Sequence, residues 1–213
     1  MSVLNARPAQ GPGGTIRRDE APTVKSLLAS LRSHDAYTYR HSLRTVRLSL
    51  LLGRACGVEA VGLRVLCLGA VVHDLGKIFI PGEVLHKAGA LTAEEWEAVK
   101  RHPLDGARMM SGVAAAEGVR RVVAEHHERW DGGGYPAGLR GEEIDFSARV
   151  VAVADAFDAM TSERPYRPAA GYAAAAAELE RCAGTQFDPQ VVLTFLRAPR
   201  ARLEGIIRGT RRA

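Results

Sequence analysis

The stretch that decides the fold is His73-Asp74-Leu75-Gly76-Lys77. The apolar run 65–72 leads directly into it and predicts a buried segment that is too short to cross a membrane. A His and an Asp at the end of a buried element lose hydration, and a metal ion would offset that cost because imidazole nitrogens and carboxylate oxygens are common metal ligands. An isolated pair of this kind is more often a hydrogen-bonded helix end with a glycine cap. The metal interpretation therefore depends on the residues around it.

Helical patterns surround this stretch on both sides. Apolar residues recur at helical spacing, Thr92 to Glu95 form a capping box, and Asp188-Pro189 is typical of a helix start. No segment alternates with a period of two, and no internal repeat is found. The fold class we predict is all-α, a helical bundle. The main predicted helices cover residues 22–32, 38–56, 60–74, 92–102, 103–110, 119–127, 146–160, 171–181 and 188–197.

Composition sets the domain organisation. The chain has 213 residues, of which 46% are hydrophobic and 25% charged, as expected for one globular domain. Residues 1–20 are rich in Pro and Gly and predict a disordered lead, residues 21–197 the domain, and residues 198–213 a basic tail. No apolar run is long enough for a membrane span. The three cysteines show no CxxC spacing, which excludes a zinc ribbon and favours a reducing cytoplasm.

The net charge of +5 is concentrated at the C-terminus. Residues 197–213 hold six arginines and one acid, so the rest of the chain is formally neutral. We expect this tail to be a solvated end that catalysis does not need, with contact to RNA or acidic lipid as the alternative. The body shows no basic stripe with interleaved aromatic residues, so polymeric nucleic acid is not an expected partner.

Five of the seven histidines lie where metal ligands would be useful, at predicted helix ends or on apolar faces. Asp155 sits inside an apolar helix, where a carboxylate is hard to explain unless it is paired or bound to metal. Any one of these residues alone could be a satisfied core residue, but together they predict a metal centre. The candidates are His41, His73, Asp74, His102, His126, His127 and Asp155.

A long loop, residues 130–138, contains three consecutive glycines, Gly132 to Gly134. Such a run does not hold regular structure without cost, and a loop of this length inside a compact domain is usually functional. We expect it to be mobile and to serve substrate access or partner docking.

The order and length of these motifs resemble the HD-GYP domains, a branch of the HD metal-dependent phosphohydrolases. The resemblance extends from about residue 24 to residue 196. It is carried by residues 34–41 (HDAYTYRH), 73–78 (HDLGKI), 91–103, 126–136 (HHERWDGGGYP), 153–162 (VADAFDAMTS), 164–167 (RPYR) and 187–189 (FDP).

The resemblance implies a mostly helical domain with two divalent metal ions, usually iron or manganese. His41, His73, Asp74 and Asp155 would hold one metal, and Asp74, His102, His126 and His127 the second, with Asp74 as the bridge. Lys77 would reach the scissile phosphate or the attacking water. The implied substrate contacts are Arg164, Arg167, Asp35, Lys77 and the Gly134-Tyr135-Pro136 loop, which is also tied to partner binding in that family.

The implied activity is hydrolysis of the bacterial second messenger cyclic di-GMP to pGpG, with GMP as a further product, by a hydroxide that bridges the metals. Two alternatives stay open: a non-enzymatic cyclic-dinucleotide sensor, and a phosphohydrolase of another nucleotide. A signalling protein at the loop and a homodimer are the further partners we expect. Some members of that family hold a third metal through a glutamate four residues before the first histidine. Here that position is Tyr37, a poor ligand near pH 7, so we expect two metals.

Overall fold

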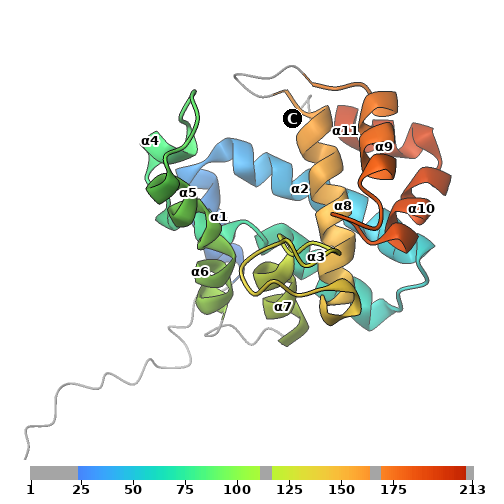
Figure 1. Cartoon of the computed structure of the whole chain (residues 1–213), viewed down its shortest axis with the longest axis horizontal. Coiled ribbons are helices and arrows are strands. Elements are labelled where there is room, and N and C mark those ends of the chain that lie inside the picture. The colour runs from blue at the N-terminus through green and yellow to red at the C-terminus, as the bar shows by residue number, and fades with distance from the viewer. Residues whose placement is uncertain (1–23, 111–116, 164–168, 210–213) are drawn as a thin grey trace, which may run out of the picture.

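The computed structural model describes residues 24–110, 117–163 and 169–209, and within these ranges it contains helices but no strand (Figure 1). The predicted all-α class is confirmed. None of the described helices is long and apolar enough to cross a membrane. The lead expected over residues 1–20 lies outside the described residues. The elements are α1 (Val24–His34), α2 (Ala36–Ala55), α3 (Ala60–Val72), η1 (Leu75–Phe79), α4 (Gly82–Leu85), α5 (Ala93–Lys100), α6 (His102–Met109), α7 (Glu117–Glu125), η3 (Gly141–Glu143), α8 (Phe146–Thr161), α9 (Tyr172–Arg181), α10 (Pro189–Arg197) and α11 (Arg200–Gly209).

Side-chain caps fix several helix starts where the sequence indicated them. The Thr92 hydroxyl accepts from Glu95 N, and the Glu95 carboxylate accepts from Thr92 N, which is the predicted capping box of α5. Asp188 caps α10 and Pro189 occupies its first turn. Asp35 caps α2, because its carboxylate accepts from Tyr37 N at 2.8 Å and from the Thr38 hydroxyl at 2.5 Å. Each cap supplies an acceptor to a helix N-terminus that would otherwise leave N–H groups unpaired.

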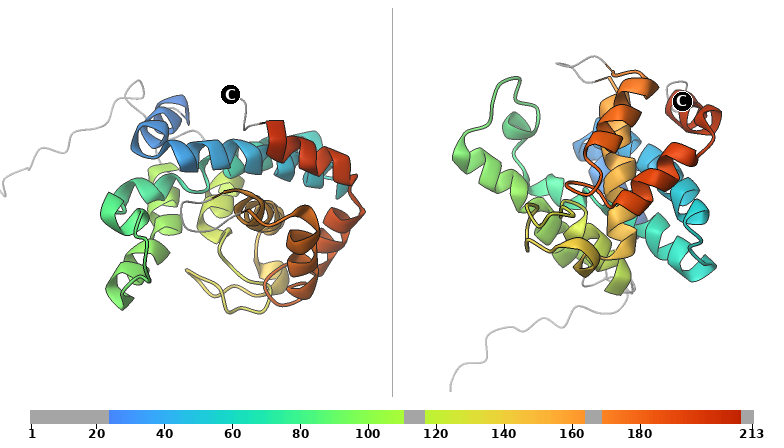
Figure 2. Two further views of the ribbon diagram at one scale, coloured as in Figure 1. Left: turned by 90° about the horizontal axis from the view of Figure 1, so that it is seen from above. Right: turned by 45° about the vertical axis from the view of Figure 1, so that its right-hand side comes forward.

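Two hydrophobic cores hold the bundle together. The larger one joins α2, α3 and α8 with α9 to α11 through buried residues such as Leu48, Phe157 and Phe195. The smaller one joins α1, η1, α6 and α7 around residues such as Leu75 and Val123. Helix α8 runs through the middle of the molecule, with α9 to α11 on one side and α4 to α6 on the other (Figures 1 and 2). The turn between α3 and η1, which carries His73 and Asp74, therefore lies where the two cores meet.

The residues expected to form a solvated basic tail do not behave as one. Residues 200–209 form helix α11, and its Leu203 and Ile207 are 0% and 8% exposed inside the larger core. These two residues are four positions apart and so share one face of the helix, while Arg200, Arg202 and Arg208 are exposed. The apolar face was not recognised in the sequence because the segment is rich in arginine. A chain that ends at Leu196 would lose the face, so we no longer expect the tail to be dispensable.

Replacing Leu203 with alanine should lower the free energy of unfolding by about 2–5 kcal/mol, because it removes buried methyl groups and leaves a cavity. Urea unfolding followed by circular dichroism measures this change. The exposed neighbour Arg202, changed to alanine, is the matched control and should alter stability by no more than about 0.5 kcal/mol. Equal stability of the two variants would show that α11 does not contribute to the core.

Candidate metal centre

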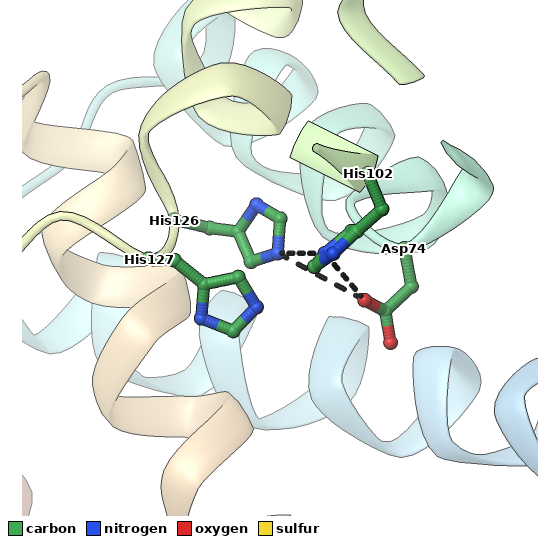
Figure 3. A group of neighbouring side chains, drawn as sticks. All are labelled: Asp74, His102, His126 and His127. Carbon is green, nitrogen blue, oxygen red and sulfur yellow. Dashed lines mark hydrogen bonds and ion pairs between the residues drawn. The ribbon is translucent and has the colours of Figure 1, made fainter. Parts of the chain in front are cut away.

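The structure brings all seven predicted ligands together from separate elements. His41 lies on α2, His102 begins α6, and Asp155 lies on α8. Two groups form in which the ligand atoms all lie within 4.8 Å of one another. The first group, whose side chains point toward one another in Figure 3, is Asp74, His102, His126 and His127; the second is His41, His73 and Asp155.

Three of the imidazoles are oriented by the same type of hydrogen bond. In each, Nδ1 lies within hydrogen-bond distance of the carbonyl oxygen three residues earlier. A carbonyl only accepts, so Nδ1 carries a proton, and Nε2 carries the lone pair whenever the imidazole is neutral. The pairs are His73 with Ala70 (2.8 Å), His102 with Val99 (2.7 Å) and His126 with Val123 (2.8 Å).

These lone pairs then face one another in a buried space. Nε2 of His102 lies 3.3 Å from Nε2 of His126, and when both rings are neutral neither atom has a proton to donate to the other. Nε2 of His73 is buried and has no hydrogen-bond partner among the described residues. Buried acceptors without donors are costly, and a cation among them relieves that cost. The donor set therefore fits a divalent metal.

Asp74 lies between the two groups. Its Oδ1 is 3.3 Å from Nε2 of His102 and 3.9 Å from Nε2 of His126, whereas its Oδ2 is 3.4 Å from Nε2 of His73. Oδ2 also accepts from the Lys77 ammonium at 2.6 Å. Burial alone would raise the pKa of Asp74, but Lys77, His73 and His102 hold the pKa well below its usual range. Asp74 is thus an ionised carboxylate with one oxygen turned to each group.

The two adjacent histidines of the first group are neutral. Burial, together with the neighbouring imidazoles, lowers the pKa of His126 well below its usual value. Burial and His102 likewise lower the pKa of His127 to about 3. A neutral imidazole is the form that binds metal, so these residues need not lose a proton before they can act as ligands.

Two carboxylates, Asp155 and Asp158, fix the orientation of the His41 ring. Nε2 of His41 lies 2.7 Å from Asp155, and Nδ1 lies 2.6 Å from Asp158. Burial lowers the pKa of His41, but the hydrogen bonds with Asp155 and Asp158 outweigh burial and raise the pKa to about 9. Arg44 in turn donates to both oxygens of Asp158, at 2.6 and 2.9 Å. The buried charge of Asp158 is therefore balanced, and Nε2 of His41 is aimed at the second group.

Sequence reasoning missed Arg44 and Asp158. Both sit three residues after a predicted ligand, Arg44 after His41 and Asp158 after Asp155, and each thereby shares a helix face with it. A buried Arg and a buried Asp at matching positions on two helices were the signal available. Neither was recognised, because the pairing of α2 with α8 becomes visible only in three dimensions.

Gly76 explains how η1 packs so closely against the start of α6, where His102 lies. A Cβ atom at this position would overlap the carbonyl oxygen of His102 and would lie 2.7 Å from the backbone nitrogen of Gly106. Only glycine lets η1 pack this tightly against α6. The glycine that the sequence suggested as a helix cap is needed here for close backbone contact.

Comparison with known proteins agrees with this arrangement. The family model of the HD domain matches residues 24–191. The chain belongs to the HD domain family. It is 40% identical over 198 residues to the cyclic di-GMP phosphodiesterase response regulator RpfG of Xanthomonas campestris, a match that covers 90% of this chain and 51% of that protein.

Two further matches extend this result. The HD domain is 36% identical over 150 residues to 3'3'-cGAMP-specific phosphodiesterase 1 of Vibrio cholerae, covering 70% of this chain and 35% of the relative. The solved structure of Bd1817, a HDG"Y"P protein from Bdellovibrio bacteriovorus, has the same fold, with a TM-score of 0.62 at 23% identity over 88% of this chain and 58% of that one. The chain spans about half the length, or less, of these two curated relatives.

The glycine-rich loop of the HD domain is held in place by hydrogen bonds to a buried carboxylate. The carboxylate of Glu128, 4% exposed, accepts hydrogen bonds from the backbone nitrogens of Ala137 (2.6 Å), Gly138 (3.2 Å) and Leu139 (3.1 Å). A Cβ atom on Gly134 would lie 2.5 Å from the Cα atom of Glu128, so the loop folds back closely onto this residue. The expectation of a mobile loop did not anticipate these contacts. Glu128 follows the predicted ligands directly, but its role was not recognised.

The loop places Tyr135 against the metal centre. Its ring stacks on that of His127 with centroids 4.9 Å apart and planes inclined by 25°. Both rings line a cleft of about 530 Å³ whose other walls include Tyr37, Lys77 and Asp155. Four of the predicted ligands, His41, His102, His127 and Asp155, therefore line, together with Lys77, a space large enough for a nucleotide.

The structure supports the other predicted substrate contacts less directly than Lys77 and Tyr135. Asp35 lines the cleft, but both of its carboxylate oxygens serve the cap of α2. Arg164 and Arg167 lie outside the described residues. The assignment of these three residues to substrate binding stays a prediction.

Replacing Asp158 with asparagine should weaken metal binding by about 10- to 100-fold, because the neutral amide no longer fixes the His41 ring or balances Arg44. Titration with Mn²⁺ against a competing chelator measures the affinity. The control is Asp188→Asn, which changes a buried carboxylate bound to Arg149 at 2.7 Å outside both ligand groups. A folded Asp158→Asn protein with unchanged Mn²⁺ affinity would refute the role given to Asp158.

Proposed function

We propose that this chain is a metal-dependent phosphodiesterase that hydrolyses cyclic di-GMP to pGpG, with GMP as a further product. The observation that carries the proposal is the pair of buried ligand groups that meet at Asp74 and reach the cleft through His41, His102, His127 and Asp155. The relative from Xanthomonas campestris, itself named a cyclic di-GMP phosphodiesterase, supports the same activity.

The charge of the ligand set suits an anionic substrate. When the two dications are bound, His41 gives up the proton that its pKa of about 9 otherwise retains, so that five neutral imidazoles surround the site. The carboxylates Asp74 and Asp155 then contribute two negative charges against four positive ones, so positive charge remains for a phosphodiester. When bound, the two ions, iron or manganese in our proposal, lower the pKa of water to near neutrality and neutralise phosphate oxygens. Asp158 adds no net charge, because Arg44 balances it. The protein thus holds its buried charges in pairs and leaves the metal sites cationic.

Lys77 is the residue placed to meet the phosphate. Its side chain is 24% exposed, lines the cleft, and contacts Asp74, the carboxylate between the two ligand groups. An ammonium there stabilises negative charge on a non-bridging oxygen as it develops. Gly134, Tyr135 and Pro136 would close the other side of the cleft around the substrate. Asp35, Arg164 and Arg167 complete the substrate contacts that we propose.

The test is incubation of protein loaded with Fe²⁺ or Mn²⁺ with cyclic di-GMP, followed by chromatography of the products. We expect pGpG to appear first, with any GMP appearing later. Metal-depleted protein, restored by adding the ion back, is the control. Fully loaded protein that leaves cyclic di-GMP intact would contradict the proposal.

A different cyclic dinucleotide is the second candidate substrate, because the chain also resembles a 3'3'-cGAMP-specific phosphodiesterase. Parallel assays with 3'3'-cGAMP give the ratio of kcat/KM values and decide between the two. A sensor without activity is less well supported, since ligand recognition alone does not require seven convergent metal-binding side chains.

The remaining proposals concern the cell. The free cysteines Cys56, Cys67 and Cys182 support a reducing cytoplasm. We propose that a signalling protein docks on the loop, whose Ala137 and Gly138 are exposed. We also propose that the chain forms a homodimer, which light scattering would detect.

Asp74→Ala should abolish turnover and deplete both metals, whereas Lys77→Ala should keep the metals and lower only the rate. The reason is that Asp74 has one oxygen toward each ligand group, while Lys77 contacts Asp74 and cannot act as a ligand when charged. Elemental analysis beside the activity assay separates the two effects. A full metal content in Asp74→Ala would refute the bridging assignment.

The protein should bind about two metal ions per chain, which is the number that the two ligand groups support. Tyr37, four residues before His41, adds no carboxylate for a third ion. Elemental analysis of anaerobically purified protein saturated with Fe²⁺ or Mn²⁺ gives the stoichiometry. Reproducible loading near three ions would overturn this expectation, and Tyr37→Glu offers a comparison in which a third ion could gain a ligand.

A further inference from the structure

A tryptophan stands at the rim of the cleft. Trp96, on α5, lines the cleft and is 46% exposed, which is unusual for so large an apolar ring. Helix α5 and the short α4 form an arm that projects from the bundle (Figures 1 and 2). The indole thus borders the cleft on the side formed by this arm.

Stability of the fold does not account for this indole. Helix α5 contains no buried residue, and Trp96 belongs to neither hydrophobic core of the described residues. The arm is held locally instead, by the capping box of Thr92 and Glu95 and by the Lys87 ammonium, which lies 2.6 Å from the Glu95 carboxylate. A tryptophan selected for packing would bury its ring, whereas this one leaves nearly half of its surface open to water.

Aromatic rings connect Trp96 with the metal centre. Its ring meets that of Tyr135 edge to face, with centroids 6.3 Å apart and planes inclined by 74°. Tyr135 stacks in turn on His127, a member of the first ligand group. One tyrosine ring therefore separates the exposed indole from a metal-ligand candidate. A group attached to a phosphate at the cleft floor would reach Trp96 by passing Tyr135.

The chemistry of the cleft indicates what that group is. Lys77 and the ligand groups at the floor suit a phosphate, while Leu85, Val99 and Trp96 offer an apolar wall. A ligand with an anionic centre and a flat apolar ring matches both parts, and a nucleotide has this form. Stacking on an aromatic side chain recognises the π-face of a base. The two-ring face of a purine buries more apolar area against an indole than the one-ring face of a pyrimidine.

We propose that Trp96 is the stacking platform for one purine base of the cyclic dinucleotide whose phosphate lies at the metal centre. The proposal rests on the proposed function for the class of substrate. Trp96 favours a purine over a pyrimidine, and it does not distinguish guanine from adenine, because both present the same kind of face. Selection between these two bases falls to other residues.

Fluorescence tests the stacking directly. The chain has two tryptophans, Trp96 and Trp130, and Trp130 packs beside Arg149, whose guanidinium lies 5.6 Å from the indole centroid. Trp130→Phe keeps an aromatic ring there and leaves Trp96 as the single indole. Metal-loaded Trp130→Phe protein is mixed with cyclic di-GMP in a stopped-flow instrument. We expect saturable quenching of Trp96 emission, and cyclic di-UMP should need at least about tenfold higher concentration.

Steady-state kinetics gives the second test. Trp96→Ala should raise KM for cyclic di-GMP by about 5- to 150-fold with little change in kcat, and Trp96→Phe should restore part of the loss. The control is Leu193→Ala, which removes an exposed apolar side chain on α10 outside the cleft. Circular dichroism of Trp96→Ala should match the unchanged protein, because α5 buries no residue.

The outcomes separate this inference from the proposed function. Turnover of cyclic di-GMP without quenching, and with an unchanged KM in Trp96→Ala, would overturn the stacking platform and leave the phosphodiesterase intact. Quenching by cyclic di-GMP without turnover would support the platform and contradict the activity. Equal quenching by cyclic di-UMP and cyclic di-GMP would overturn the preference for purines.

Discussion

The metal centre depends on a simple constraint, which is that three buried imidazoles each donate a hydrogen bond from Nδ1 to the carbonyl three residues earlier. This bond uses a carbonyl in the last turn of a helix, where carbonyl groups are less fully paired than in the helix interior. It also fixes the tautomer, so that every Nε2 lone pair points inward. Buried nitrogen acceptors then face one another without donors. This arrangement costs free energy unless a cation lies between them.

The second ligand group is built on a different principle. His41 donates to a carboxylate, Asp158, instead of a carbonyl, and Arg44 holds that carboxylate on its other side. The network ties α2 to α8 at the level of the metal centre, so the same contacts support the bundle and aim the ligand. Removing one member of such a buried network leaves a charge unpaired, which is far more costly than the pair is stabilising. The orientation of the His41 ring therefore depends on Arg44 and Asp158, which belong to neither group of metal-ligand candidates.

Sequence alone predicted much of this structure, for reasons that can be named. Local signals gave the helix starts at Thr92 and Asp188, because a cap lies next to the helix it serves. The seven ligands were accessible as polar residues in apolar or helix-end positions, and the structure brings them into two groups. Arg44 and Glu128 were not recognised, since their partners lie far away in space or on backbone atoms. Helix α11 was missed because its two core residues are outnumbered by arginines.

The floor and the rim of the cleft differ in how firmly they are held. At the floor, the metal-ligand candidates His41 and His102 are buried, and the helices that carry them, α2 and α6, belong to the larger and the smaller hydrophobic core. At the rim, the α4–α5 arm buries no residue in its helices and depends on a capping box and an exposed ion pair. Regions with few buried contacts open at lower free energy than the core. The arm can therefore change position while the buried candidate ligands keep their geometry, and this division suits the proposed phosphodiesterase site.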